Sequence, residues 1–558
     1  MKKVDWSGLG RAYLFFWFFS GVTHSLLLFS GATGSVPFRQ GVIFSLLWLI
    51  PLLLFPKRTR VISAAIGGVL WLFSLINLGY FAVYGQEFSQ SVLFIIFESN
   101  PAEASEYVDQ YFVWWMIPFA VGYSAIAYWL WQRVRPLEMA PGYARAAITL
   151  VVIALIAPPS FKVMRKGGNM DMLTEAIMNR MEPAVPWQFV IGLIKYKDQL
   201  AHMQVLLDKS QSIPPIANLV DQHAGKPATL VMVIGESTNR QHMSLYGYAR
   251  KTSPELEAMR DQLTLFNQVY ASRPYTIEAL QQVLTFADQE NPDLYLTKPS
   301  LMAIMKQAGY KTYWITNQQT LTKRNTMLTT FSEQMDEQVY LNHQRSQNSY
   351  SFDGSTLEPF QRILQDGAER KFIVIHLLGT HMRYKYRFPP EYEKFEGKSG
   401  LPAWVTDEQA PMINEYDNAI LYNDFVVASL IKQLGASKQN SMLLYFSDHG
   451  EDVYDWPNHD FLGRNEGKPT PPMYAIPFFL WASEEWKKAD SRRFEHYRDR
   501  TYQASHLIHT WADLTGLRFE GFDPTKSLIN PAFKERPILV GDPGNPQGLI
   551  DLRTMLKK

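Results

Sequence analysis

Five long stretches without a charged residue dominate the first 165 positions of the chain. They cover residues 12–31, 40–56, 61–85, 111–132 and 146–161. A helix needs about 20 apolar residues to cross a bilayer, and the third and fourth stretches meet this length comfortably. The second and fifth are shorter and contain Pro51 and Pro158–Pro159, which disfavour an uninterrupted helix. Buried helices of a soluble protein are the alternative, but so many apolar stretches leave no polar faces to cover them. We therefore predict a transmembrane domain of five spans over residues 1–165.

Basic residues are concentrated before the first stretch and in every second loop between the stretches, so most of them lie on one side of the membrane. Lys2, Lys3 and Arg11 precede the first stretch, and further basic residues lie in 57–60 and 133–145. Residues 86–110, by contrast, hold five acidic residues and no basic one. Because basic loops stay in the cytoplasm, the N-terminus is predicted to be cytoplasmic, and five crossings place the rest of the chain outside. In a bacterium this is a multi-pass inner-membrane protein whose C-terminal part is a periplasmic or extracellular domain.

The chain beyond residue 162 has no charge-free run of membrane length. Residues 166–224 mix charges with short amphipathic pieces and contain Pro214–Pro215, which predicts membrane-proximal helices and a linker. From 225 to 558 short apolar runs alternate with helical patterns. Strands are expected at 228–234, 312–315, 372–378, 442–446 and 476–481. This alternation predicts an α/β domain with a mainly parallel sheet, which the predicted topology places outside the cytoplasm.

Composition excludes several classes of function. The 558 residues include 54 Lys+Arg and 53 Asp+Glu, and a net charge of +1 provides no basic surface for nucleic acid. There is no cysteine, which excludes disulfides, thiolate metal sites and a cysteine nucleophile. The absence of cysteine does not decide the compartment, because a large extracytoplasmic domain does not require disulfides.

Residues that can bind a metal ion follow two of the predicted strands. The strand at 228–234 runs into Glu236, and the strand at 442–446 runs into Asp448 and His449. An open α/β sheet places its ligands at the carboxyl ends of its strands. Carboxylates combined with an imidazole suit a divalent ion of borderline softness, above all Zn²⁺. A helix cap and a turn are the ordinary alternatives for the two motifs taken singly, and their occurrence together favours a metal site.

Further motifs surround these strand ends. They are Gly235-Glu236-Ser237, Arg240, Ser244-Leu245, Gly247-Tyr248, Arg250, Thr252, Pro254, Thr316-Asn317, His376–His381, Tyr416-Asp417-Asn418 and Ser447–Glu451. With the five apolar stretches, they make nearly the whole chain resemble the bacterial phosphoethanolamine transferases, which belong to the sulfatase-like, alkaline-phosphatase superfamily. Segments 84–91, 272–276 and 316–320 resemble the branch that modifies the lipopolysaccharide core at heptose. The resemblance implies a bundle of five transmembrane helices followed by a C-terminal α/β sulfatase-like domain.

The resemblance also implies a catalytic site. Carried over by position, it implies a zinc ion bound by Glu236, Thr276, Asp448 and His449, with the Thr276 hydroxyl as the nucleophile. Ser272, in the same loop, is the alternative nucleophile. The lipid A branch of the family has cysteines beside this threonine, whereas this chain has none, so packing must hold the loop.

Substrate contacts are implied at six further positions. His381 and His459 match two family histidines, which would bind the phosphoryl group or protonate leaving groups. The remaining substrate-binding candidates are Asn317, Lys323, Ser99 and Glu103. His376 is expected to be a core histidine.

The function implied is the transfer of phosphoethanolamine from the membrane lipid phosphatidylethanolamine to lipopolysaccharide, through a covalent phosphothreonine-type intermediate. Two alternatives remain. One is a glycerol-phosphate transferase resembling the lipoteichoic acid synthases, which share five spans and a sulfatase-like domain. The other is an inactive membrane scaffold that binds envelope glycans. The Gly235-Glu236-Ser237 opening favours the transferase over the first, and the retained metal-site residues disfavour the second.

Overall fold

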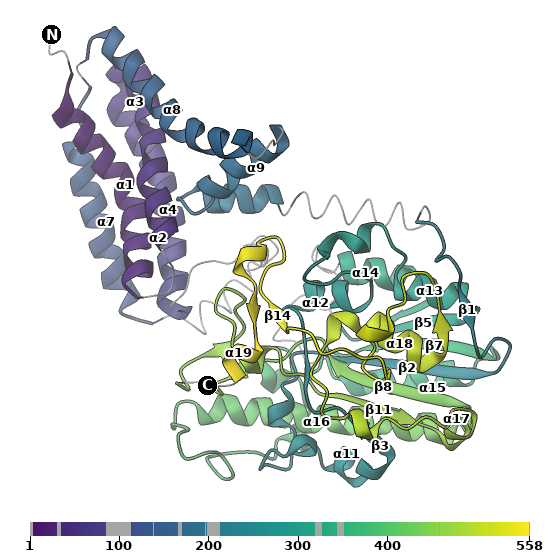
Figure 1. Cartoon of the computed structure of the whole chain (residues 1–558). Helices are drawn as coiled ribbons and strands as arrows, with labels where there is room; N and C mark the ends of the chain where they lie inside the picture. Colours follow the sequence, from purple (N-terminus) through teal and green to yellow (C-terminus); the bar gives the residue numbers. More distant parts are fainter. Residues whose placement is uncertain are drawn as a thin grey trace. The chain divides into compact units, whose positions relative to one another are not determined.

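The computed structural model divides the chain into two compact units, Met1–Ala201 and His202–Lys558 (Figure 1). It describes residues 4–30, 35–84, 113–137, 139–165, 170–195, 197, 213–318, 326–342, 351–456 and 458–556. Helix α9 (Met170–Met181) belongs to the first unit. Strand β1 (Val220–Asp221) pairs with β13 (Leu517–Arg518) of the second unit, five residues before the predicted domain start at 225. The predicted boundaries at 165 and 224 stay predictions.

The described part of the first unit is helical. Its longer helices are α1 (Trp6–Phe29), α2 (Ser35–Phe44), α3 (Leu49–Leu54), α4 (Thr59–Tyr84), α7 (Met116–Arg133), α8 (Pro141–Arg165) and α9. A short 3₁₀ helix, Ser45–Trp48, joins α2 to α3. Pro51 therefore falls in the first turn of α3, where its missing N–H costs no helical hydrogen bond. Pro158 and Pro159 lie inside α8, towards its C-terminal end.

Four helical segments are long and apolar enough to cross a membrane. They are Trp6–Phe29, Ser35–Leu54, Pro56–Ala82 and Pro141–Phe161. The second and fifth predicted stretches, which contain proline, are both among them. Helix α7, in the fourth stretch, is not, because tyrosines, tryptophans, Gln132 and Arg133 make its 18 residues less apolar. Helix α7 still packs in this unit, where Tyr123 stacks on Phe18 of α1 with ring centroids 4.7 Å apart. The apolar helices fit a membrane anchor, and the count of five spans stays a prediction.

A seven-stranded sheet forms the centre of the second unit. Its strand order is β3-β11-β8-β2-β7-β5-β6. The strands are β2 (Ala228–Gly235), β3 (Leu263–Leu265), β5 (Lys311–Thr316), β6 (Glu337–Tyr340), β7 (Arg370–His376), β8 (Ser441–Ser447) and β11 (Phe478–Ala482). All neighbouring pairs from β8 to β6 are parallel. The strand predicted at 476–481 is β11, which starts at Phe478 and runs antiparallel to both of its neighbours.

Successive side chains of a strand point to opposite faces of the sheet. The central strands carry apolar side chains on both faces, and helices cover both. One face packs against α15 (Leu357–Leu364) and α16 (Ala410–Ala436), with Val231, Ile373 and Leu443 in a shared core. On the other face, Phe372 contacts Trp511 of α18 (Leu507–Thr515), with ring centroids 5.3 Å apart. Figure 1 shows α16 along one side of the sheet and α18 on the other. The central strands are thus buried on both faces, and their polar groups lie at the strand ends.

Candidate metal centre and nucleophile

The carboxyl ends of four neighbouring strands meet at one edge of the sheet. The register places Gly235 of β2 opposite Ser447 of β8, and Ile234 of β2 opposite His376 of β7. His376 in turn lies opposite Thr316 of β5. Side chains that follow these residues therefore lie close together, as expected for an open α/β sheet.

Three of the four predicted metal ligands come together at this edge. Potential ligand atoms of Glu236, Asp448 and His449, all buried, lie within 4.8 Å of one another. His449 Nε2 is 3.2 Å from Glu236 Oε1 and 3.3 Å from Asp448 Oδ2. Asp448 Oδ1 accepts hydrogen bonds from the backbone N–H groups of Ser237 and His449, which fixes the carboxylate. The site offers two carboxylates and one imidazole, which is a donor set that suits Zn²⁺.

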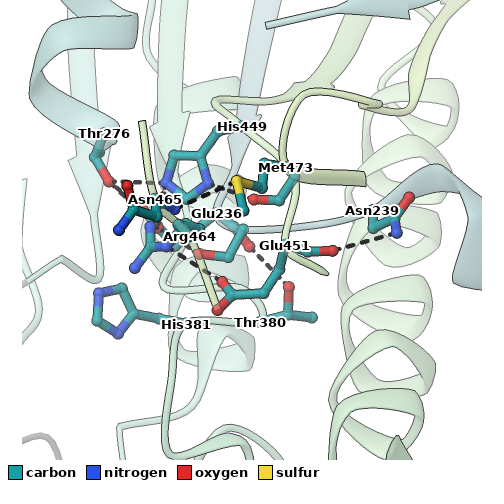
Figure 2. Close-up of polar contacts among 12 residues, drawn as sticks. Glu236, Asn239, Thr276, Thr380, His381, His449, Glu451, Arg464, Asn465 and Met473 are labelled. Atoms are coloured by element: carbon teal, nitrogen blue, oxygen red, sulfur yellow. Dashed lines mark hydrogen bonds and ion pairs between the residues drawn. The ribbon is translucent and has the colours of Figure 1, made fainter. Parts of the chain in front are cut away.

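Thr276 brings its hydroxyl to the same cluster. It is the first residue of helix α12 (Thr276–Val283) and is partly exposed. Its Oγ1 donates to Glu236 Oε2 at 3.0 Å and lies 3.4 Å from His449 Nε2 (Figure 2). Ser272 is fully buried, and its hydroxyl has no hydrogen-bond partner among the described residues. Of the two hydroxyls in this loop, the structure therefore brings that of Thr276 to the metal-binding residues.

The carboxyl groups of the cluster titrate as a coupled pair. Burial and the nearby charge of Glu236 raise the pKa of Asp448 well above its ordinary value. Burial also acts to raise the pKa of Glu236, but His449 more than offsets it, and the pKa of Glu236 lies well below its ordinary value. Asp448 Oδ2 has no hydrogen-bond partner among the described residues. Two buried carboxyls in contact do not both ionise without a further positive charge.

Backbone geometry fixes Glu236 from the side of β7. The positive φ of Gly379, 54°, lets the loop after β7 turn against Glu236. A Cβ atom at position 379 would lie 2.8 Å from the backbone N and O of Glu236. The N–H of the next residue, Thr380, donates to the carbonyl of Glu236 at 3.0 Å. Only glycine fits this close approach, so the position is specific for the site.

Two residues that sequence reasoning missed also contact Glu236. Gln318, just beyond β5, donates from Nε2 to Glu236 Oε2 at 3.0 Å. Arg464 follows β10 (Leu462–Gly463) and places Nη1 2.6 Å from His449 Nε2 and 3.8 Å from Glu236 Oε1. Gln318 follows a predicted strand and could have been found from that position, whereas a two-residue strand such as β10 leaves no pattern in the sequence.

Comparisons with known proteins place this geometry in a family. Residues 228–517 match the sulfatase family. The chain is 50% identical to phosphoethanolamine transferase EptC of Escherichia coli K12, over 99% of this chain and 96% of that protein. It is 51% identical to phosphoethanolamine transferase CptA of Salmonella typhimurium, with the same two coverages. The chain belongs to the phosphoethanolamine transferases of the sulfatase family. The family resemblance predicted from the motifs is thereby confirmed.

Solved structures share the fold of this transferase. The crystal structure of the C-terminal periplasmic domain of EcEptC from Escherichia coli, in complex with Zn, is 55% identical with a TM-score of 0.60. It covers 61% of this chain and 97% of that domain. The integral membrane protein lipooligosaccharide phosphoethanolamine transferase A of Neisseria meningitidis has a TM-score of 0.62 at 19% identity, covering 96% of this chain and all (100%) of that one. The fold therefore extends over both units of the transferase.

The predicted histidines of the transferase have different surroundings. Figure 2 shows the ring of His381 on the side of the Arg464 guanidinium. Its Nδ1 is buried without a hydrogen-bond partner among the described residues, and burial lowers its pKa to about 3. His459 instead stacks on Trp404, with ring centroids 3.7 Å apart, and its Nδ1 lies 2.7 Å from the carbonyl of Tyr454. His376 is fully buried edge-on to Trp314, as expected for a core histidine.

The remaining candidates are either engaged with the protein or lie outside the described residues. Asn317 is fully buried; its Nδ2 donates to Asp353 and its Oδ1 accepts from Ser351. Asp353 in turn accepts from the backbone of Leu378 and Gly379. These contacts support the loop that touches Glu236 and lend no support to a substrate contact at Asn317. Lys323, Ser99 and Glu103 lie outside the described residues.

Polar contacts hold the loop that leads to Thr276. Arg273 forms a two-pronged pair with Glu466, at 2.5 Å from Nε and 2.9 Å from Nη2. Gln289 donates from Nε2 to the carbonyls of Ser272 and Gly541. The loop leading to Thr276 is therefore tied both to the segment that carries Arg464 and to the C-terminal part of the domain.

Proposed function

We propose that this transferase moves phosphoethanolamine from phosphatidylethanolamine to lipopolysaccharide, at the core heptose, with Thr276 as its nucleophile. The contacts of Thr276 Oγ1 with Glu236 and His449, at 3.0 and 3.4 Å, carry this proposal. A threonine hydroxyl is a weak nucleophile at its free pKa and needs a base or a metal to lose its proton. The contacts provide such surroundings for Thr276, and Ser272 has none of them.

The residues present fit a zinc ion. Glu236, Asp448 and His449 would hold it, with the hydroxyl oxygen of Thr276 as a fourth ligand. Asp448 Oδ2, which has no hydrogen-bond partner among the described residues, is an acceptor available to such an ion. Bound zinc would favour the ionised hydroxyl and stabilise negative charge on the phosphoryl oxygens. The zinc complex of the Escherichia coli domain supports this assignment.

The reaction consists of two displacements at phosphorus. Thr276 Oγ1 gives up its proton and bonds to phosphorus, while the bond from phosphorus to the glycerol oxygen breaks. The glycerol oxygen takes a proton, so that diacylglycerol leaves and phosphoethanolamine stays on Thr276. An acceptor hydroxyl then loses its proton and replaces Thr276 Oγ1 on phosphorus, and the threonine regains its proton.

The predicted substrate residues complete this proposal. His381 and His459 bind the phosphoryl group or move protons to the leaving oxygens. Lys323, Ser99 and Glu103 are kept as substrate contacts, with the Glu103 carboxylate as the partner for an ethanolamine ammonium. Asn317, through Asp353, positions the loop against Glu236.

Membrane anchoring serves the substrates of this reaction. Donor and acceptor are both lipids, so tethering the enzyme in their plane raises their effective concentration. The apolar helices of the first unit would provide this anchor, with five spans, a cytoplasmic N-terminus and the catalytic domain in the periplasm.

A glycerol-phosphate transferase and an inactive scaffold are the competing functions. Identity of 50% to a phosphoethanolamine transferase over nearly the full chain favours the proposed donor over glycerol phosphate. The assembled cluster of Glu236, Asp448 and His449 disfavours an inactive scaffold, which would have no use for a buried metal site.

A labelled donor tests the proposal directly. The purified full chain is incubated with phosphatidylethanolamine that carries isotopically labelled ethanolamine, and its peptides are then mapped by mass spectrometry. We expect one labelled phosphoethanolamine on Thr276, and none when phosphatidylglycerol replaces the donor. Label on Ser272, or transfer from phosphatidylglycerol alone, would refute the nucleophile or the donor, respectively. Lipopolysaccharide from a deletion strain should lose phosphoethanolamine from its core and keep its lipid A unchanged.

A further inference from the structure

Arg464 places a positive charge among the metal-binding residues. Its Nη1 lies 2.6 Å from His449 Nε2 and 3.8 Å from Glu236 Oε1, and its Nε lies 3.4 Å from Glu451 Oε2. Figure 2 shows the guanidinium between His449 and Glu451. The side chain is 13% exposed, so little solvent surrounds the charge.

Arg464 lies beside three buried carboxyl groups of the centre. Glu236, Asp448 and Glu451 are three carboxyl groups with fully buried side chains. The positive charge of Arg464 adds to that of a bound divalent ion and offsets part of the negative charge of these carboxyl groups. It therefore lowers the repulsion that an incoming phosphodiester would meet at short range.

The guanidinium also has donors to spare for an anion. A guanidinium presents five N–H groups in a planar fork that matches two oxygens of a phosphoryl group. No described residue accepts a hydrogen bond from Nη2 of Arg464. Once a metal engages His449 Nε2, the lone pair that now faces Nη1 is no longer available. Both terminal nitrogens of Arg464 can then donate to a ligand beside Thr276.

The segment that carries Arg464 is held firmly in the domain. Strand β10 pairs with β9 (Asp452–Val453), which directly follows Glu451. Asn465 is fully buried, and its backbone N–H contacts the sulfur of Met473 at 3.3 Å. Glu466 then forms the buried pair with Arg273 of the nucleophile loop. The cation is thus positioned relative to both the metal-binding residues and the loop that leads to Thr276.

We propose that Arg464 binds the phosphoryl group of the phosphodiester donor, through two of its non-bridging oxygens, as a fixed positive charge beside a single metal ion. The ligand class is a phosphodiester or phosphate monoester anion. This inference deepens the function proposed above and rests on it for the identity of the donor.

The test compares Arg464→Met and Arg464→Lys with the wild-type full chain in detergent, all loaded with zinc. We expect both variants to bind as much zinc as the wild type. Because the guanidinium acts most strongly as charge develops, Arg464→Met should lower kcat about 10²–10³-fold, as the loss of one anion-stabilising donor does, with KM much less affected. Arg464→Lys should recover part of this loss, and methylguanidinium should restore part of the activity of Arg464→Met.

A second measurement uses inorganic phosphate alone as the probe. Phosphate should raise the melting temperature of the zinc-loaded wild type by more than it raises that of zinc-loaded Arg464→Met. Arg362→Met, an exposed substitution on α15, is the control and should behave as the wild type in both assays. Wild-type kcat together with an undiminished phosphate shift in Arg464→Met would overturn the inference, as would loss of zinc from both variants. If no label reaches Thr276 of the wild type, the proposed function fails, and the phosphate comparison still decides the role of Arg464.

Discussion

The buried pair of Arg273 and Glu466 gives the sharpest stability prediction. Only 9% and 5% of the two side chains is exposed, so both charges are largely removed from water. Burial raises the pKa of the Glu466 carboxyl, and Arg273 acts to lower it, which is the balance expected for a pair that is costly to bury. Glu466→Gln would keep the size of the side chain and leave the Arg273 guanidinium buried without its anion.

The expected loss is large compared with the stability of a domain. Breaking a buried pair by removing one partner costs about 3–5 kcal/mol, whereas a domain is stable by about 5–15 kcal/mol in total. At about 2 °C per kcal/mol, the melting temperature should fall by about 6–10 °C. The measurements are urea unfolding and thermal melting of the fragment 213–558, both followed by tryptophan fluorescence. The crystal structure of the related Escherichia coli domain, determined without its membrane helices, supports the use of this fragment.

Two comparisons decide whether the charge is the cause. Arg273→Met combined with Glu466→Leu removes both charges and keeps apolar volume, so it should recover most of the loss. Glu255→Gln breaks an exposed pair with Lys432 and should cost less than about 1 kcal/mol. A Glu466→Gln variant as stable as the wild type would refute the reasoning. A double variant as unstable as the single one would assign the loss to packing and not to charge.

Three further predictions concern the nucleophile, a buried histidine and the topology. Thr276→Ala should keep its fold and zinc but lose turnover, as measured by release of diacylglycerol, and Thr276→Ser should keep partial activity; near-normal turnover of Thr276→Ala would contradict the assignment. Burial acts to lower the pKa of His242, but Asp455 and Asp417 raise it to about 10. The charged form therefore stabilises the fold fully below pH 6.5, and this contribution is lost as pH rises towards 10, so the free energy of unfolding should fall between these values. His242→Gln should flatten the dependence of the free energy of unfolding on pH, measured by urea titrations between pH 6.5 and 10. The same pH dependence in this variant as in the wild type would contradict the prediction. A reporter active only in the periplasm should be active when fused after Lys558 and silent when fused within 57–60; the reverse would overturn the orientation.

The metal-binding residues could be predicted because each follows a long buried strand. Glu236 comes directly after the apolar run of β2, and Asp448 and His449 come directly after that of β8. Parallel strands of this length have a recognisable pattern, and their register at the carboxyl ends brings the side chains together. Thr276 could be found only from the family resemblance, since the loop before α12 carries no periodic signal.

Arg464 could not be predicted because its position depends on tertiary contacts alone. It follows a strand of two residues in a loop-rich segment, and nothing in its sequence neighbours indicates a buried site. The number of five spans stays a prediction, because α7 alone of the five predicted stretches is not selected by length and composition among the described helices. Helix α7 has the expected position, yet tyrosine and tryptophan make it less apolar than the other helices. Pro51 counted against a span in the second stretch, but it lies in the first turn of α3, a position that tolerates proline.

The long separation in sequence between the strands that form the site has a consequence for export. Ser237 and Asp448, which share a hydrogen bond beside the metal-binding residues, are 211 positions apart. In the proposed topology the second unit leaves the membrane with β2 ahead of β8, so Glu236 would have no partners with which to hold an ion until β8 follows. Metal acquisition would then come after translocation and after completion of the central sheet. Zinc in the periplasm, and not in the cytoplasm, would supply the enzyme, and a chain stalled before residue 448 would remain without metal.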